Sequence, residues 1–323
     1  MMSKLSRGIA LLSAAVMALS FTACSDSGNK EDGKYKIGIV QQLEHQALDE
    51  ATKGFKQALI DKLGEDKVTF DYQNAQGEQT NCATIATKFV NGGVDLIMAN
   101  ATIALQSAAA ATSTIPVIGT SITDYLTAGV VDSNDKPGRN VTGASDLAPI
   151  DKQIELLQQV CPDAKKVGIL YCSAEPNSVF QADKAEEYLK AANIEVTRYT
   201  VADSNEIQAV VTKAVAEVDA IYIPTDNTLA DSMGAVKNVT LPAKMPVITG
   251  EENMCKSGGL ATLSISYYDM GYSAGEMAVE ILTQGKKPAD MAIRYSTNVT
   301  QKYNKEVADA IGWTMPEGLT AIE

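Results

Sequence analysis

The sequence has very little of the chemistry on which most enzymes depend. Among its 323 residues there is one histidine, His45, and one tryptophan, Trp313. A single histidine argues against a histidine-based metal site and against a serine–histidine triad. A Walker A sequence is also missing, and Gly271-Tyr-Ser-Ala-Gly275 is too loose for a dinucleotide fingerprint. We therefore expect a protein that is not an enzyme, holds no metal and needs no cofactor.

The chain is also poor in positive charge. Its net charge is −13, which argues against nucleic acid as a partner, because that affinity comes from Lys and Arg on phosphates. The hydrophobic fraction of 45% and the charged fraction of 21% are those of a globular protein. The length is enough for two domains of ordinary size.

The cysteines fit no zinc pattern. Beyond the N-terminal segment they are Cys82, Cys161, Cys172 and Cys255, and their spacing is not that of metal ligands. Export would permit a Cys161–Cys172 disulfide, since one follows a predicted helix and the other ends the next predicted strand. The alternative is that the thiols are free and buried.

The N-terminus has the pattern of an export signal. Lys4 and Arg7 precede an apolar core at 9–21 that is too short to span a bilayer comfortably. Small residues then lead to Cys24, which resembles a bacterial lipobox. We expect a signal peptide at 1–23, acylation of Cys24 and a flexible polar tether at 24–34. The alternative is an ordinary signal peptide with an incidental cysteine.

Strand and helix patterns alternate twice along the rest of the chain. The first series begins with an apolar strand at 36–41 and a helix that Gly64 ends, and the second begins at Pro149. This alternation predicts the α/β class, with two Rossmann-like lobes built on parallel sheets and a cleft between them. Gly271 to Gly275 falls within a helical pattern and is expected to pack closely against a sheet.

Polar side chains follow almost every predicted strand. In doubly wound folds, ligands bind at the carboxyl ends of the strands. Carboxylates there suit an ammonium group, helix-start amides suit a carboxylate, and Tyr125, Tyr268 and His45 suit an apolar or aromatic group. Each residue taken alone fits a helix cap or turn residue better than a ligand contact, and it is the pattern over both sets of strand ends that indicates a site. The expected ligand-binding set is Gln42, Glu44, His45, Thr102, Thr123, Asp124, Glu175, Asn177, Ser178, Asp226, Asn227, Glu251 and Tyr268.

An ordered set of short motifs extends over residues 35–300. They are Glu44-His45-x-Ala47-Leu48-Asp49, Asn74-Ala-Gln-Gly77, Ala101-Thr102, Thr123-Asp124, Asn140-Val-Thr-Gly143, Glu175-x-Asn177-Ser178, Pro224-Thr-Asp-Asn227 and Tyr267-Tyr268-x-x-Gly271. The set resembles the solute-binding lipoproteins of ABC importers whose characterised members take aromatic amino acids, including tryptophan-binding proteins.

That resemblance implies a type I periplasmic-binding fold whose lobes close on a ligand. The expected N-terminal lobe is 35–146 plus 267–296, and the expected C-terminal lobe is 147–266 plus 297–323. Hinge strands are expected near 143–147, 262–266 and 295–299.

The resemblance also implies a function and partners. The ligand would be an aromatic or other apolar amino acid, and the partners an ABC permease and its ATPase subunits. The protein would be a monomer, anchored by lipid at the outer face of the bacterial cytoplasmic membrane, either at a Gram-positive surface or in a periplasm. Alternatives are a sugar, nucleoside or short-peptide ligand, or a sensor that reports to a membrane receptor.

Overall fold

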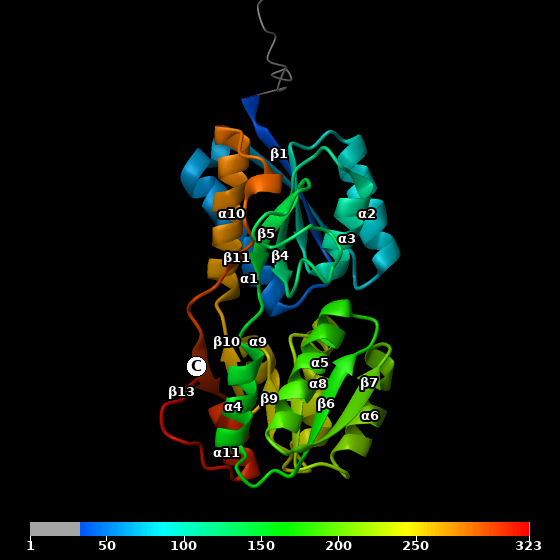
Figure 1. The fold of residues 1–323 in the computed structure, drawn as a ribbon, viewed down its shortest axis with the longest axis vertical. Helices are drawn as coiled ribbons and strands as arrows, with labels where there is room; N and C mark the ends of the chain where they lie inside the picture. Colours follow the sequence, from blue (N-terminus) through cyan, green and yellow to red (C-terminus); the bar gives the residue numbers. More distant parts are fainter. Residues whose placement is uncertain (1–32, 323) are drawn as a thin grey trace, which may run out of the picture. The chain divides into compact units, whose positions relative to one another are not determined.

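The structure, a computed structural model, describes residues 33–322 and contains two separate β-sheets (Figure 1). The predicted signal peptide and Cys24 lie outside the described residues. Within 33–322, none of the helices combines the length and apolar character needed to cross a membrane.

The first lobe is built on a six-stranded, fully parallel sheet of order β11-β5-β4-β3-β1-β2. Its strands are β1 Tyr35–Gln41, β2 Val68–Asn74, β3 Leu96–Asn100, β4 Val117–Ile122, β5 Val141–Ser145 and β11 Arg294–Tyr295. Helices α1 Gln46–Leu63 and α10 Tyr267–Gln284 pack together on one face, and α2 Gln79–Asn91 and α3 Thr102–Ala111 on the other (Figure 1).

The second lobe is built on a seven-stranded sheet of order β13-β12-β10-β9-β8-β6-β7. Its strands are β6 Lys166–Cys172, β7 Glu195–Val201, β8 Ala220–Ile223, β9 Val247–Thr249, β10 Ala261–Ser264, β12 Thr300–Tyr303 and β13 Thr320–Ala321. Only β12 runs antiparallel to its neighbour β10. Its helices are α4 Ile150–Val160, α5 Pro176–Ala191, α6 Ile207–Ala214, α7 Asn227–Asp231, α8 Met233–Thr240, α9 Glu252–Ser257 and α11 Lys305–Ile311. The α/β class with two parallel-stranded lobes is thus confirmed.

The chain crosses between the two sheets three times. The crossings lie between β5 and α4, between β10 and α10, and between β11 and β12 (Figure 1). The predicted hinge segments fall on these crossings. The exact lobe boundaries and the hinge motion itself remain predictions.

Helices α1 and α10 pack through glycines rather than through large side chains. A Cβ on Gly271 would collide with the backbone carbonyl of Ala51, and one on Gly54 would collide with that of Tyr268. The expectation that Gly271 to Gly275 pack against a sheet was therefore wrong: they pack against α1. The five residues also spell the Gly-x-Ser-x-Gly pattern of hydrolases, but they lie inside α10 and not at the strand-to-helix turn that this chemistry needs.

The described cysteines are free and buried. Cys161 belongs to the core cluster that extends through both lobes, and Cys172 belongs to a separate cluster of the second lobe. The free-thiol alternative is thus the one that this structure supports, and the Cys161–Cys172 disulfide is not formed in it.

Candidate ligand-binding site

The strand tips of the two lobes meet around a narrow cavity of about 10 Å³, which we call the cleft. Two of the hinge crossings start at β5 and β10. The order of the strands in each sheet therefore indicates how far each strand end lies from the hinge. Residues after β5, β9 and β10 are near the hinge, and residues after β1, β6 and β8 are farther from it. The cleft is lined by His45, Leu48, Ser121, Thr123, Asp146, Asn177, Thr225, Asp226, Asn227, Ala230, Glu251, Met254 and Tyr267.

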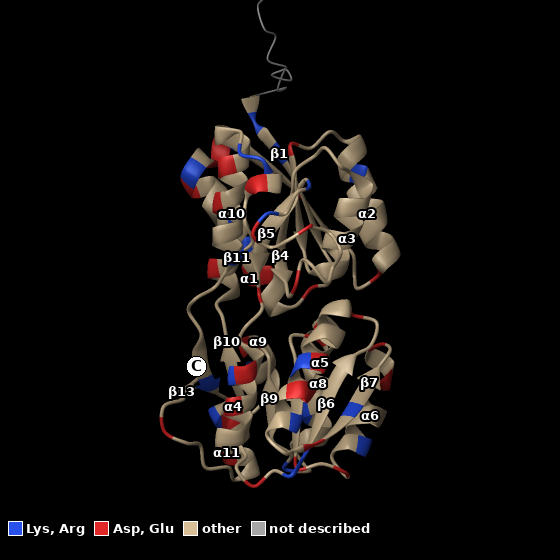
Figure 2. Ribbon diagram, viewed as in Figure 1, with Lys and Arg blue, Asp and Glu red and all other residues tan. Residues whose placement is uncertain are grey.

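Several members of the predicted set do meet there: His45, Thr123, Asn177, Asp226, Asn227 and Glu251. The lining contains acids from both lobes but no Lys or Arg. Figure 2 shows most basic residues on the outer helices and at the far ends of the sheets. Such a cavity favours a cationic group over an anion.

Asp226 is the buried N-cap of α7. One carboxylate oxygen, Oδ1, accepts from the Leu229 backbone N–H at 2.8 Å, and Oδ2 accepts from the Cys172 N–H at 2.6 Å. Burial, followed by the nearby Glu175, raises the pKa of Asp226 to about 7, although these hydrogen bonds oppose the rise. The residue is thus both a helix cap and a wall of the cleft.

Two further buried acids lie at the hinge side of the cleft. Glu251 is the N-cap of α9 and accepts from the backbone N–H groups of Asn253 and Met254. Asp146 accepts from the Tyr267 hydroxyl at 2.9 Å and from the Thr123 hydroxyl at 3.3 Å. Burial raises the pKa of Glu251 to about 7 and that of Asp146 to about 6.

Glu175 lies beneath the cleft wall and is not part of the lining. Its Oε2 accepts from the Asn227 side-chain amide at 2.6 Å and from the Asn227 backbone N–H at 3.1 Å. Its Oε1 accepts from the backbone N–H and the hydroxyl of Thr228. It therefore fixes the start of α7 and the orientation of Asn227.

Two polar bonds join the lobes directly. His45 Nε2, at the start of α1, lies 3.1 Å from Asn227 Oδ1, and Gln181 Nε2 of α5 donates to Thr123 Oγ1 at 3.3 Å. Burial lowers the pKa of His45, so the imidazole is neutral at neutral pH. The lobes thus contact each other across the cleft.

A buried acceptor beside Asp226 lacks a partner. Asn177 donates through Nδ2 to Glu175, Ser178 and the Thr225 carbonyl, but within the described residues its Oδ1 accepts no hydrogen bond. Ser178, which is fully buried, also supports Asp226. A buried acceptor of this kind is costly unless a ligand or solvent satisfies it.

The remaining predicted residues of the first lobe lie behind or outside the cleft lining. Gln42 Oε1 accepts from the Ile103 N–H at the start of α3, and Asp124 accepts from the Thr127 N–H. Glu44 is exposed. Thr102 is buried next to Ala101, a strained residue with φ of 82°. Tyr125 is fully buried, and its hydroxyl donates to the carbonyls of Gly119 and Ala144, so it supports the sheet.

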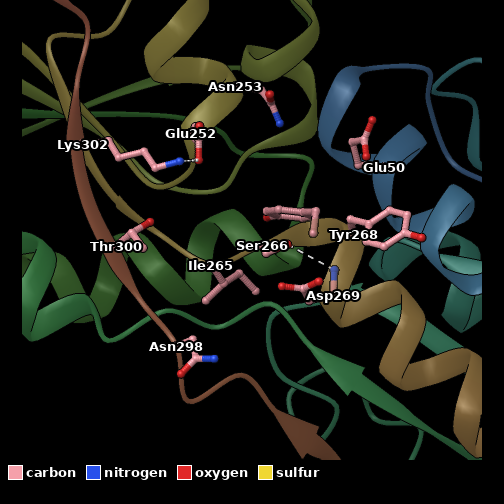
Figure 3. Close-up of a pocket in the computed structure, with 11 residues that line it drawn as sticks. Glu50, Glu252, Asn253, Ile265, Ser266, Tyr268, Asp269, Asn298, Thr300 and Lys302 are labelled. Carbon is pink, nitrogen blue, oxygen red and sulfur yellow. Dashed lines mark hydrogen bonds and ion pairs between the residues drawn. The ribbon is translucent and has the colours of Figure 1, made fainter. Parts of the chain in front are cut away.

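Tyr268 faces a different cavity on the hinge side, of about 330 Å³. Figure 3 shows it across from Glu252 and Asn253 of α9, with Asn298, Thr300 and Lys302 of the returning hinge strand on another wall. Lys302 donates to Glu252 at 2.7 Å. Tyr267 lines both this cavity and the cleft.

The sequence reasoning missed the apolar part of the lining. Leu48, Ala230 and Met254 lie within helices α1, α7 and α9, and none of them is a polar residue after a predicted strand. Asp146 directly follows β5 and Ser121 is the second-last residue of β4, so both lie at strand ends like the predicted residues. A consistent use of the strand-tip rule would have included both.

The sequence matches the profile of the ABC transporter substrate binding protein family over residues 36–322. It is 41% identical over 305 residues to the tyrosine-binding protein of Clostridioides difficile (strain R20291), covering 90% of this chain and 88% of that protein.

Two similar solved structures represent different states, one with a bound ligand and one ligand-free and open. An ABC domain from Streptococcus pneumonia in complex with L-Trp is 36% identical, with coverage of 90% of this chain and 100% of that chain and a TM-score of 0.86. The ligand-free, open structure of a substrate-binding protein with adhesive properties from Clostridium difficile has the same identity, coverage of 90% and 99%, and a TM-score of 0.70. The present structure is therefore more similar to the complex than to the open form, which agrees with the contacts across its cleft.

Proposed function

The chain belongs to the family of ABC transporter substrate-binding proteins, and we propose that its ligand is an amino acid with an aromatic or other apolar side chain. Proteins of this family work outside the cytoplasm. One relative is a tyrosine-binding protein and one similar structure is a complex with L-Trp. The proposal assigns the chain a binding role without catalysis.

The observation that carries the proposal is the pairing of a buried carboxylate with a buried free acceptor. Asp226 and Asn177 Oδ1 lie on the same wall, linked through Ser178. An α-ammonium group offers three donors and one positive charge, and it would satisfy both acceptors by charge-assisted hydrogen bonds. No Lys or Arg of the lining competes for that position.

The other ligand groups have complementary surfaces in the cleft. Hydroxyls of Ser121, Thr123 and Thr225 can receive the ligand carboxylate without a basic side chain. Leu48, Ala230 and Met254, with the ring of Tyr267, provide the apolar contact that an aromatic side chain needs. Of the other predicted residues of the first lobe, Gln42 and Asp124 hold backbone N–H groups behind these walls, whereas Glu44 is exposed and Tyr268 faces the other cavity.

Capture of the ligand proceeds by lobe closure. In the open form, the ligand binds one lobe, and rotation at the three crossings brings the second lobe onto it. Because the ligand contacts both lobes only in the closed form, it binds that form more tightly and shifts the equilibrium toward it.

The same proposal includes the membrane anchor and the transport partners. Acylation of Cys24 would hold a monomeric chain at the outer face of the membrane, where the closed lobes deliver ligand to a permease driven by ATPase subunits. Replacement of Cys24 by serine should then release the protein into the soluble fraction.

A thermal-shift panel tests the ligand class. The twenty amino acids, together with sugars and nucleosides, are added to the purified protein, and the midpoint of unfolding is recorded. We expect the largest increases with L-Trp, L-Tyr and L-Phe. A clear increase with a sugar or nucleoside, and none with these three amino acids, would contradict the proposal.

A further inference from the structure

We propose that Glu175 is a positioning residue for lobe closure, which acts through Asn227 on a direct hydrogen bond to His45. This series, Glu175–Asn227–His45, is named the latch below. It rests on the lobe closure of the proposed function but not on the identity of the ligand. It stabilises the closed form through a hydrogen bond between protein groups, without the ligand.

Glu175 fixes the orientation of the Asn227 side-chain amide. Glu175 is 2% exposed, and its carboxylate can only accept hydrogen bonds. The Asn227 Nδ2 must therefore point toward Glu175 Oε2, at 2.6 Å, and the amide oxygen must point toward the first lobe. The Asn227 backbone N–H donates to the same Oε2, which holds the residue at both ends.

The orientation of the Asn227 amide determines which ring nitrogen of His45 carries the proton in this bond. Since Asn227 Oδ1 is an acceptor, His45 Nε2, at 3.1 Å, must carry the proton and donate across the interface. His45 comes from the first lobe, as the N-cap of α1, and Asn227 from the second, as the first residue of α7. Separation of the lobes must break this bond, while the bonds of Glu175 lie within the second lobe and persist.

The latch has a thermodynamic consequence for ligand affinity. If only a fraction of the ligand-free protein is closed, the apparent affinity is reduced by that fraction. A bond that raises the closed fraction therefore improves affinity without touching the ligand. A net hydrogen bond supports a change of roughly threefold to tenfold in the closed-to-open ratio.

The test measures the closed fraction with no ligand present. Spin labels are placed at Ala83→Cys on α2 and Ala191→Cys on α5, both exposed, in a chain with Cys24→Ser. The native cysteines beyond Cys24 are buried, so labelling is selective. Pulsed dipolar spectroscopy then gives the interlobe distance distribution of the wild type, His45→Phe, Glu175→Ala and the double variant.

We expect each single variant to lower the closed-to-open ratio about threefold to tenfold, and the double variant to match the singles, because all three lose the same bond. Thr212→Ala, which removes an exposed hydrogen bond within α6 of the second lobe, should leave the ratio unchanged. If Glu175→Ala does not fold, Asn227→Ala takes its place.

Two results would overturn the latch: an unchanged ratio in the single variants, or effects that multiply in the double variant. A failure of amino acids to bind would refute the proposed function instead, and it would leave this ligand-free measurement untouched.

Discussion

At the scale of single residues, the buried acids of the cleft have two roles at once. Asp226 and Glu251 cap helices and also line the cavity. Reading the sequence cannot separate a cap from a ligand contact, because both uses favour the same residue types after a strand. In the structure both carboxylates cap a helix and still line the cavity, and a carboxylate has lone pairs enough for a cap and a ligand.

Neutralising Asp226 tests its role as the partner of the ammonium group. Asp226→Asn keeps the size of the side chain and one acceptor for the cap. We expect amino acid affinity in a calorimetric titration to fall at least tenfold, because the ligand cation loses a buried counter-charge. Asp231→Asn removes an exposed acid of the same helix and should have no effect. Equal affinities of Asp226→Asn and the wild type would remove Asp226 from the site.

The pKa values of the buried acids predict how stability depends on pH. Because the folded pKa values of Asp146, Asp226 and Glu251 lie above the unfolded values, their contribution to stability is present at low pH and is lost as pH rises through about 6 to 7. The lowered pKa of His45 has the opposite sign. Without ligand, the midpoint of unfolding should therefore fall more steeply between pH 5 and 8 in the wild type than in Glu251→Gln. Parallel curves for the wild type and Glu251→Gln would show that the pKa of Glu251 is not raised in the folded protein.

Ligand affinity should depend on pH in the opposite direction. An ammonium group needs the ionised carboxylate, so affinity should rise from pH 5 to 8 and binding should release protons near pH 7. Calorimetry in buffers of different ionisation enthalpy measures that release. Proton uptake on binding would contradict an ammonium next to Asp226.

At the scale of elements, the contact between α1 and α10 supports the first lobe. Gly271 and Gly54 allow the two helix backbones to touch, and α1 carries His45 and Leu48 into the cleft at its start. The position of the cleft residues on α1 thus depends on α10, a helix from the last quarter of the chain.

Adding one methyl group tests that contact. Gly271→Ala places a Cβ against the Ala51 carbonyl and should lower the free energy of unfolding by about 2 kcal/mol, as overpacking does. Gly234→Ala is the matched control, because a Cβ in that exposed position of α8 meets nothing within 4 Å. It should be neutral or stabilising by up to about 1 kcal/mol. Chemical denaturation measures both, and equal stability of the two variants would contradict the close packing.

The elements that the sequence predicted well are those with long, regular patterns. The apolar spacing at 150–160 predicts a helix, which is α4, and the strand predicted at 36–41 is β1, where the apolar run is continuous. Helix α9 has no predicted counterpart, because its six residues carry too little periodicity. The pattern near 228–236 predicts one short helix, but the structure has two there, α7 and α8, which are divided at Ser232.

The site could be predicted only in part for the same reason. Polar residues after strands are visible in a sequence, and six of the expected residues, His45, Thr123, Asn177, Asp226, Asn227 and Glu251, do line the cleft. Which of them face the cavity depends on long-range contacts, such as the hydrogen bonds that turn Glu175 and Gln42 away from it. Apolar liners such as Leu48 and Met254 have no local signal of their own.

At the scale of the whole molecule, two sheets joined by three crossings place a cavity where both lobes contribute acids, amides and apolar surface. Under the proposed function, binding and closure would be one event, because a ligand that bonds to Asp226 and Asn177 on the second lobe would also meet Leu48 and Thr123 on the first. The proposed latch would add a contact between the lobes that does not involve the ligand.

The most direct test of this account is a calorimetric titration of the purified protein with L-tyrosine and L-tryptophan at pH 7.5. We predict saturable binding at one site per chain and a negative heat-capacity change from the burial of the aromatic side chain. Absence of binding by both amino acids, with saturable binding of a sugar or nucleoside at the same cleft, would contradict the account.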